Sequence, residues 1–222
     1  MKRLAFAVRV LAPMVLAALL TPPARGAGNP AIVKLTKPDV TCEIVFEDGK
    51  KLVVTPKGAP LNEGTYWVKS LSLFKKDKDG QTWEMRAVGN LTNVQVIIVE
   101  EGQEKILDLG PPIAFHGGVS QPKDKPDILA IQLSVLGRYG EGYLPQAYVG
   151  GGRRSPPMFR ILTADGKKVF EDRFAATTTN SLHYEWTIPR GLTGKFKLEI
   201  QPDIGPFEWV VGVDAFDIPM AR

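Results

Sequence analysis

Apolar and polar residues alternate along much of the chain with a period of two, which is typical of β-strands that bury one face. The clearest example is the segment 64–87, where Tyr66 and Phe74 share one phase and a second alternation begins at Trp83. Between the two runs, residues 77–80 (Asp-Lys-Asp-Gly) form a polar turn whose glycine accepts a positive φ. The pattern predicts a hairpin in which Phe74 lies opposite Trp83 as an aromatic cross-strand pair.

Further strands are predicted in both halves of the chain. Asp48-Gly49 and Asp165-Gly166 each lie between two alternating runs and indicate tight hairpins. The run at 93–100 is rich in β-branched residues and is typical of a strand that is buried on both faces. Other strands are predicted at 128–136, 183–188, 195–200 and 209–213. Because no stretch keeps a 3.6-residue period over three turns, we predict an all-β protein.

The division of the chain is indicated by residues 116–126, where apolar content falls and turn residues cluster as in a linker. We therefore predict two tandem β-sandwich domains, at residues 38–115 and 127–220. A weak internal similarity accompanies this division, because 43–52 resembles 160–169 around a shared Asp-Gly-Lys-Lys turn. Either a duplication or the common chemistry of hairpin turns explains this similarity.

The N-terminal segment has the parts of a secretory signal peptide. Lys2 and Arg3 give it a basic start, and the run 4–20 is apolar except at Arg9 and Pro13. The small residues around Arg25 then suit a signal peptidase, so residues 1–26 are predicted to be removed after Gly26 or one residue later. The uninterrupted apolar part is too short to cross a bilayer. We expect a secreted or periplasmic protein with no integral membrane segment after cleavage.

Removal of the signal changes the electrostatic argument. The full chain has 28 Lys and Arg against 24 Asp and Glu, a net charge of +4. Residues 1–26 carry four of these basic residues and no acidic one, so the mature chain is electrically neutral. Proteins that bind nucleic acid concentrate positive charge on one face or in one run. Charges of mixed sign therefore argue against a nucleic-acid partner.

Residues that support catalysis or metal binding are sparse. Cys42, the single cysteine, excludes an internal disulfide and falls in the apolar phase of its strand, so we expect a small buried residue. His116 and His183 are the only histidines, which excludes a three-histidine zinc site. Residues 77–80 lack the further ligands of a calcium loop, and 150–152 precede no helix that could hold a phosphate. We predict no catalytic residue, no metal ligand and no cofactor, and no enzymatic activity of this chain alone.

Aromatic and arginine side chains are the stronger candidates for recognition. Trp67 is out of phase with its neighbours Tyr66 and Val68, so it should point to the opposite face. The Gly- and Pro-rich segment 137–157 carries the remaining candidates. Flat aromatic rings suit recognition because they stack on saccharides or peptides at low entropic cost. The candidate ligand-binding residues are Trp67, Tyr139, Tyr143, Tyr148, Arg153 and Arg154. Alternatively, Trp67 covers a sheet edge or packs against the other domain.

Two short patterns resemble known sandwich families. Leu61-x-x-Gly-Thr-Tyr-x-Val68 resembles the strand entry of prealbumin-like, carboxypeptidase-regulatory-like domains, and 186–198 resembles the penultimate strands of bacterial immunoglobulin-like modules. The first half departs from the regulatory-like pattern, because it lacks the Pro-Val-x-Gly-Ala opening of many such domains. Such modules are usually structural or binding units, so the resemblance implies no catalytic residue.

These observations favour a secreted, non-catalytic binding or structural module whose partner is a protein or a cell-envelope component. The alternative is a carbohydrate-binding module that assists a separate hydrolase, with Trp67, Tyr139, Tyr143 and Tyr148 as stacking surfaces.

Overall fold

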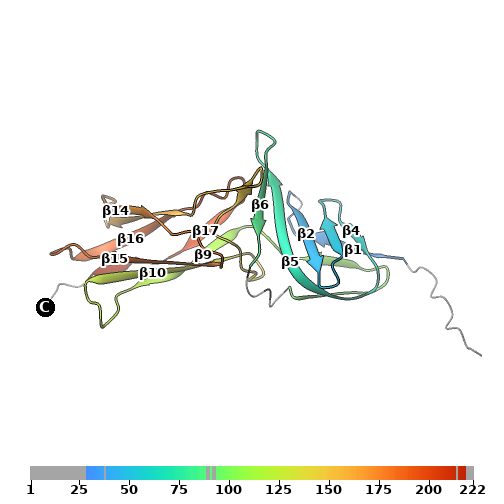
Figure 1. The fold of residues 1–222 in the computed structure, drawn as a ribbon, viewed down its shortest axis with the longest axis horizontal. Coiled ribbons are helices and arrows are strands. Elements are labelled where there is room, and N and C mark those ends of the chain that lie inside the picture. Colours follow the sequence, from blue (N-terminus) through green and yellow to red (C-terminus); the bar gives the residue numbers. More distant parts are fainter. Residues whose placement is uncertain (1–28, 38, 89–90, 92–93, 214, 219–222) are drawn as a thin grey trace, which may run out of the picture.

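The computed structural model describes residues 29–37, 39–88, 91, 94–213 and 215–218. Within these residues the chain forms β-strands and no helix, so the predicted all-β class is confirmed. The predicted signal peptide, residues 1–26, lies outside the described residues, as does the end of the predicted second domain. Figure 1 shows an elongated arrangement, with β2, β1 and β4 toward one end and β14, β15 and β16 toward the other.

The N-terminal half of the chain contributes two sheets. Its strands are β1 (Ala31–Leu35), β2 (Thr41–Phe46), β3 (Lys51–Val54), β4 (Ala59–Leu61), β5 (Gly64–Lys76), β6 (Thr82–Arg86), β7 (Val96–Val99) and β8 (Glu104–Leu107). The smaller sheet has the order β4-β1-β8, and β8 runs parallel to β1. In the larger sheet the long strand β5 is central, because it pairs with β2, β6 and β7.

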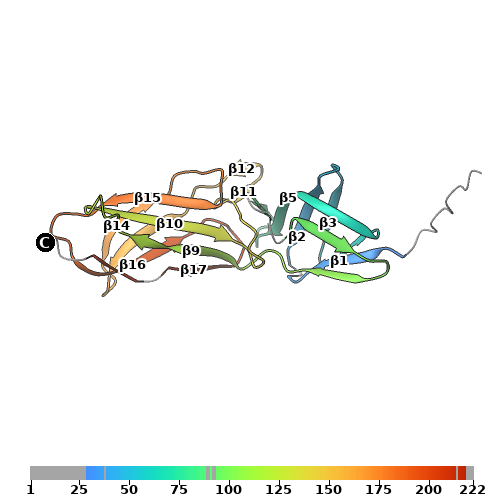
Figure 2. The ribbon, with the colours of Figure 1, turned by 90° about the horizontal axis from the view of Figure 1, so that it is seen from below.

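The C-terminal half contributes two four-stranded sheets. Its strands are β9 (Ile113–Ser120), β10 (Ile128–Leu136), β11 (Tyr148–Val149), β12 (Gly152–Arg153), β13 (Met158–Thr163), β14 (Lys168–Arg173), β15 (Ser181–Thr187), β16 (Gly194–Gln201), β17 (Trp209–Gly212) and β18 (Phe216–Ile218). The sheet orders are β15-β10-β9-β17 and β14-β13-β16-β18. Rings meet between them, with Phe159 4.7 Å from Tyr184 and Phe170 5.3 Å from Trp186 between centroids. The two sheets therefore face each other in a sandwich-like packing, and Figure 2 looks onto the face of the sheet β15-β10-β9-β17.

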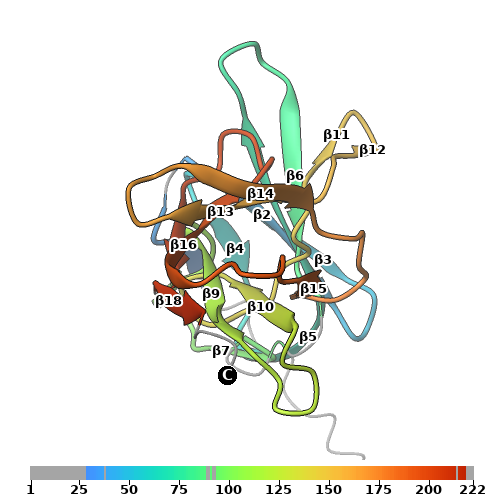
Figure 3. The same cartoon turned by 90° about the vertical axis from the view of Figure 1, so that its left-hand side faces the viewer.

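The two halves are joined by more than the chain connection. Strand β11 pairs with β6, with Tyr148 opposite Glu84 and Val149 opposite Trp83, and β12 continues this sheet. A segment that follows β10 thus returns to extend the sheet of the N-terminal half, as the adjacent β6, β11 and β12 in Figure 3 also show. An ion pair of 3.0 Å between Lys37 Nζ and Glu208 Oε2 adds a further contact.

The hairpin predicted at 64–87 is present as β5 and β6, but its register differs by one residue. Phe74 lies opposite Glu84, and Trp83 lies opposite Lys75. The reason is the turn, in which the Asp77 N–H donates to the Gln81 carbonyl at 3.0 Å, so three residues separate the closing pair instead of two. A shift of one residue moves a side chain to the other face, so Phe74 and Trp83 do not form the predicted pair.

The segment 116–126 was predicted to be a linker, but its first part is a strand. Residues 116–120 belong to β9 and pair with β10, Ser120 opposite Ala130. The glycines that suggested a chain break serve close packing: a Cβ on Gly117 would overlap the Gln132 carbonyl of β10. Only the end of the segment connects the two strands, as a hairpin loop. The two other hairpins, at Asp48-Gly49 and Asp165-Gly166, are confirmed.

Cys42 is fully buried on β2, as predicted, and packs in the apolar core. Burial raises the pKa of its thiol well above the ordinary value, since a thiolate would lose its hydration there. The thiol is therefore held in its neutral, unreactive form.

Candidate binding site

An apolar cavity of about 160 Å³ lies in the N-terminal half, between the edge strands β7 and β8. Apolar side chains of β2, β5 and β7 line one part of it: Ile44, Val68, Leu71, Val96 and Ile97. The segment 105–109 and Tyr139 line the other part. A cavity of this size holds one benzene-sized group, since a dry engineered cavity of about 150 Å³ does so.

The cavity exists because two consecutive strands enter different sheets. Strand β7 pairs with β5, whereas β8 pairs with β1 in the facing sheet. The turn between them is tight, with Gly102 at a φ of +67° and the Gln103 N–H donating to the Glu100 carbonyl. Among the described residues, no further strand pairs with either β7 or β8. Each of these strands therefore leaves one edge available for pairing.

Exposed apolar side chains flank the cavity. Trp67 on β5 is 50% exposed and lies opposite Val96 of β7, which lines the cavity. Ile98 of β7 is 57% exposed and Ile106 of β8 is 59% exposed. Val96 and Ile98 were not expected to face solvent, because the sequence pattern predicted that the run at 93–100 is buried on both faces. That prediction is wrong for Val96 and Ile98, since this part of β7 has an outer face that no described residue covers.

The charges at the cavity leave one lysine without an ion-pair partner in the described part of the chain. Asp108 is paired with Arg138, whose Nε lies 3.1 Å from its Oδ1, although not along the N–H direction of a hydrogen bond. Glu104 is paired with Lys34 at 2.6 Å. Lys105 lies opposite the fully buried Val33, on the inner face of its sheet, and no ion pair involves it among the described residues. Its stem can cover the cavity wall while its ammonium group reaches water.

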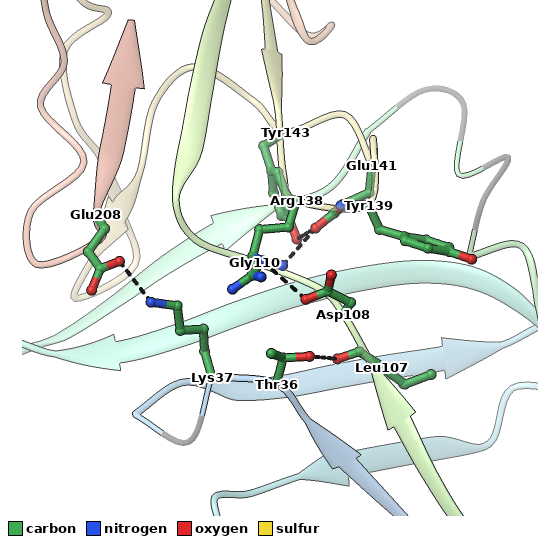
Figure 4. Close-up of polar contacts among 10 residues, drawn as sticks. All are labelled: Thr36, Lys37, Leu107, Asp108, Gly110, Arg138, Tyr139, Glu141, Tyr143 and Glu208. Atoms are coloured by element: carbon green, nitrogen blue, oxygen red, sulfur yellow. Dashed lines mark hydrogen bonds and ion pairs between the residues drawn. The ribbon is translucent and has the colours of Figure 1, made fainter.

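The loop that carries Tyr139 is held by a buried carboxyl group, as Figure 4 shows. Glu141 is 1% exposed. Its Oε1 accepts hydrogen bonds from the Gly110 N–H at 2.7 Å and the Tyr143 hydroxyl at 2.9 Å, and its Oε2 accepts one from the Tyr139 N–H at 3.0 Å. Burial raises the pKa of this carboxyl, while the three donors act in the opposite direction. Glu141 thus ties the loop to the chain connection between the two halves.

The six residues predicted to bind a ligand do not form one cluster. Tyr139 is 49% exposed and lines the cavity, and Trp67 lies beside it. Tyr143 is fully buried, and its hydroxyl donates to Glu141, so it cannot stack on a ligand and this prediction is wrong. The physical reason is that the Gly-rich loop folds inward, where residues 141–147 are buried between the halves.

The other three candidates make internal contacts. The guanidinium carbon of Arg86 lies 3.8 Å from the centroid of the Tyr148 ring. The Arg86 side chain therefore covers one face of this ring. Arg153 donates to Gln146 Oε1 at 3.0 Å and to the Thr177 carbonyl. Arg154 donates to Asp203 Oδ2 at 3.0 Å. These side chains hold the segment 146–154 in place, at a distance from the cavity along the sheet.

Sequence reasoning missed Lys105, Val96 and Ile106. Alternation alone could have placed Val96 and Ile98 on one face of β7, but it could not show that this face is open. Whether a lysine on a short strand lines a cavity depends on the sheet that the strand joins. The sequence did not contain that information in any local pattern.

A second, more polar hollow lies on the outer face of the sheet β15-β10-β9-β17. It has a volume of about 440 Å³ and is lined by His116 and His183 together with polar residues of β10 and β15. His116 lies opposite Ser134, and His183 lies opposite Gln132. Gly118 of β9, opposite Gln132, leaves this face without a side chain at one position, which contributes to the hollow. Among the described residues that line it, none is Phe, Tyr or Trp.

No group of three or more His, Cys, Asp or Glu side chains in the described part of the chain is arranged to hold a metal ion. Within the same residues, no helix has the length and apolar character to span a membrane. Comparisons of the chain with protein-family models, with curated proteins and with solved structures find no match.

Proposed function

We propose that the protein is an exported, non-catalytic binding module that recognises a protein or a cell-envelope component through the cavity between β7 and β8. The observation that supports this most strongly is the combination of an apolar cavity with two unpaired strand edges. Trp67, Ile98 and Ile106 flank it, and they are among the most exposed apolar side chains described. Exposed apolar surface around a hollow is a common mark of an interaction site.

The proposal includes an architecture of two tandem β-sandwiches, of the immunoglobulin-like or prealbumin-like kind, after a signal peptide at residues 1–26. We place the junction near residues 110–112, because β9 begins at Ile113 and pairs only within the C-terminal half. The β11–β12 segment then acts as a brace between the two units. With the signal removed, the protein is secreted or periplasmic, where a partner from the cell envelope is available.

Carbohydrate binding is the competing proposal. Trp67 and Tyr139 remain exposed and could stack on a sugar ring. However, the hydrogen-bonding side chains that a saccharide also needs line the polar hollow of the other half, where no described Phe, Tyr or Trp ring offers a stacking surface. Because the two requirements are met at different places, we favour a protein partner.

Site-specific photo-cross-linking tests the proposed function. A benzophenone amino acid at position 106 should give a cross-linked species with an envelope extract of the source organism, and excess unlabelled protein should abolish it. The same group at position 53 is the matched control, since Val53 is an exposed β-branched residue of β3 that does not line the cavity. Equal labelling at both positions, or none at either, would contradict the proposal. Binding on a glycan array that is lost in Trp67→Ala would favour the carbohydrate function.

A further inference from the structure

The cavity between β7 and β8 has three features that together select one class of partner. It accepts a single apolar group, and among the described residues it borders an unpaired strand edge and carries an unpaired cation. This inference rests on the proposed function, because it assumes that the same cavity is the binding site.

The edge of β8 offers specific backbone groups for pairing. The Gln103 carbonyl accepts from the Ile32 N–H at 2.9 Å, and the Leu107 carbonyl accepts from the Thr36 N–H at 3.1 Å. Because backbone groups of successive residues in a strand point to opposite sides, those of Glu104 and Ile106 point away from β1. An extended peptide that pairs with this edge would lie directly beside the cavity.

The charge at the cavity indicates what the peptide must carry. Since Arg138 neutralises Asp108 and Lys34 neutralises Glu104, Lys105 leaves a net positive charge at the cavity. An apolar cavity with one cation at its border is complementary to an apolar group that is joined directly to an anion. The last residue of a polypeptide has this chemistry when its side chain is large and apolar, because the α-carboxylate is two bonds from the Cβ.

We propose that the site binds the free C-terminus of a partner protein, with the last side chain in the cavity, the α-carboxylate on Lys105 and the preceding residues paired to β8. The size of the cavity favours a terminal Phe or Leu over a Trp, because it holds about one benzene-sized group. Tyr139, at the border of the cavity, would cover part of the bound side chain.

Fluorescence polarisation with defined peptides tests this inference. The probe is a fluorescein-labelled hexapeptide that ends in Phe with a free carboxylate, and the comparison is the same peptide as its C-terminal amide. The free acid should bind roughly tenfold more tightly, as expected for one charge-assisted hydrogen bond. Lys105→Met should remove this difference, whereas Lys197→Met, an exposed lysine of β16, should leave it unchanged. Val96→Trp should weaken both peptides by filling the cavity.

Each of the following results would overturn the inference. Equal binding of acid and amide by the unaltered protein would show that no carboxylate is recognised. Equal binding of 3-phenylpropionate and the hexapeptide would show that the β8 edge is not used and that the ligand is a small acid. If no peptide binds but the benzophenone at position 106 still captures a partner, the inference fails and the proposed function stands. If both experiments fail, the cavity is not a binding site.

Discussion

The connection between the two halves depends on Glu141, and replacing it with glutamine gives the sharpest test of the structure. Glu141→Gln keeps the shape of the side chain but replaces one acceptor oxygen with an NH2 group. If the amide oxygen keeps the bonds from Gly110 and Tyr143, the NH2 group faces the Tyr139 N–H, and two donors meet in a buried place. Loss of one hydrogen bond with an unsatisfied buried donor costs about 1–3 kcal/mol. We expect the free energy of unfolding to fall by that amount.

The effect should also depend on pH, with a sign that follows from burial. Because burial raises the pKa of the Glu141 carboxyl, the folded state binds this proton more tightly than the unfolded state, whose value is near 4.5. The resulting stabilisation is present below that value and is lost as the pH rises through the pKa of the folded state. Because glutamine does not titrate, the free energy of unfolding of Glu141→Gln should fall further below that of the native protein at about pH 4 than at about pH 8.

Urea unfolding followed by tryptophan fluorescence at the two pH values measures both effects. The control is Glu63→Gln, an exposed position where we expect a change below about 0.5 kcal/mol. A deficit for Glu141→Gln that grows with pH would refute the argument, because the three donors would then outweigh burial and stabilise the carboxylate. A deficit no larger than that of the control would mean that the carboxyl does not hold the connection.

Further predictions concern packing and thiol reactivity. Gly205 and Gly150 have nearly equal positive φ values of +59° and +57°, but of the two only a Cβ at position 205 would overlap another side chain, the Trp83 ring. Gly205→Ala should therefore lower the urea midpoint more than Gly150→Ala does. Equal losses in the two variants would argue against this contact. The raised pKa and complete burial of Cys42 predict that the native protein reacts with a disulfide reagent only as fast as it unfolds, and rapid labelling in the absence of urea would contradict the burial. Intact mass of the protein recovered from its host should lack residues 1–26, and a retained Met1 would exclude cleavage of the signal.

Local pattern was sufficient to predict the all-β class, most strands and the three hairpins with Gly at their turns. The alternation in 41–46, for example, correctly identified Cys42 as a core residue, because one face of a strand packed against another sheet must be apolar. Local pattern failed where the structure depends on backbone that is distant in sequence. The register of the β5–β6 hairpin depended on one extra turn residue, and the role of Gly117 depended on the close approach of β10.

For the candidate site, the amino-acid sequence indicated which residues could serve in recognition but not where they lie in the fold. It singled out Trp67 by its phase in the strand and Tyr139 by its place in a Gly- and Pro-rich segment, and both are about half exposed. The tertiary structure alone decided that Tyr143 turns inward to Glu141, and that β7 and β8 enter different sheets. The physical reason is that burial of a loop and pairing of an edge are set by contacts between residues distant in sequence, whereas alternation reports only which face of a strand is apolar.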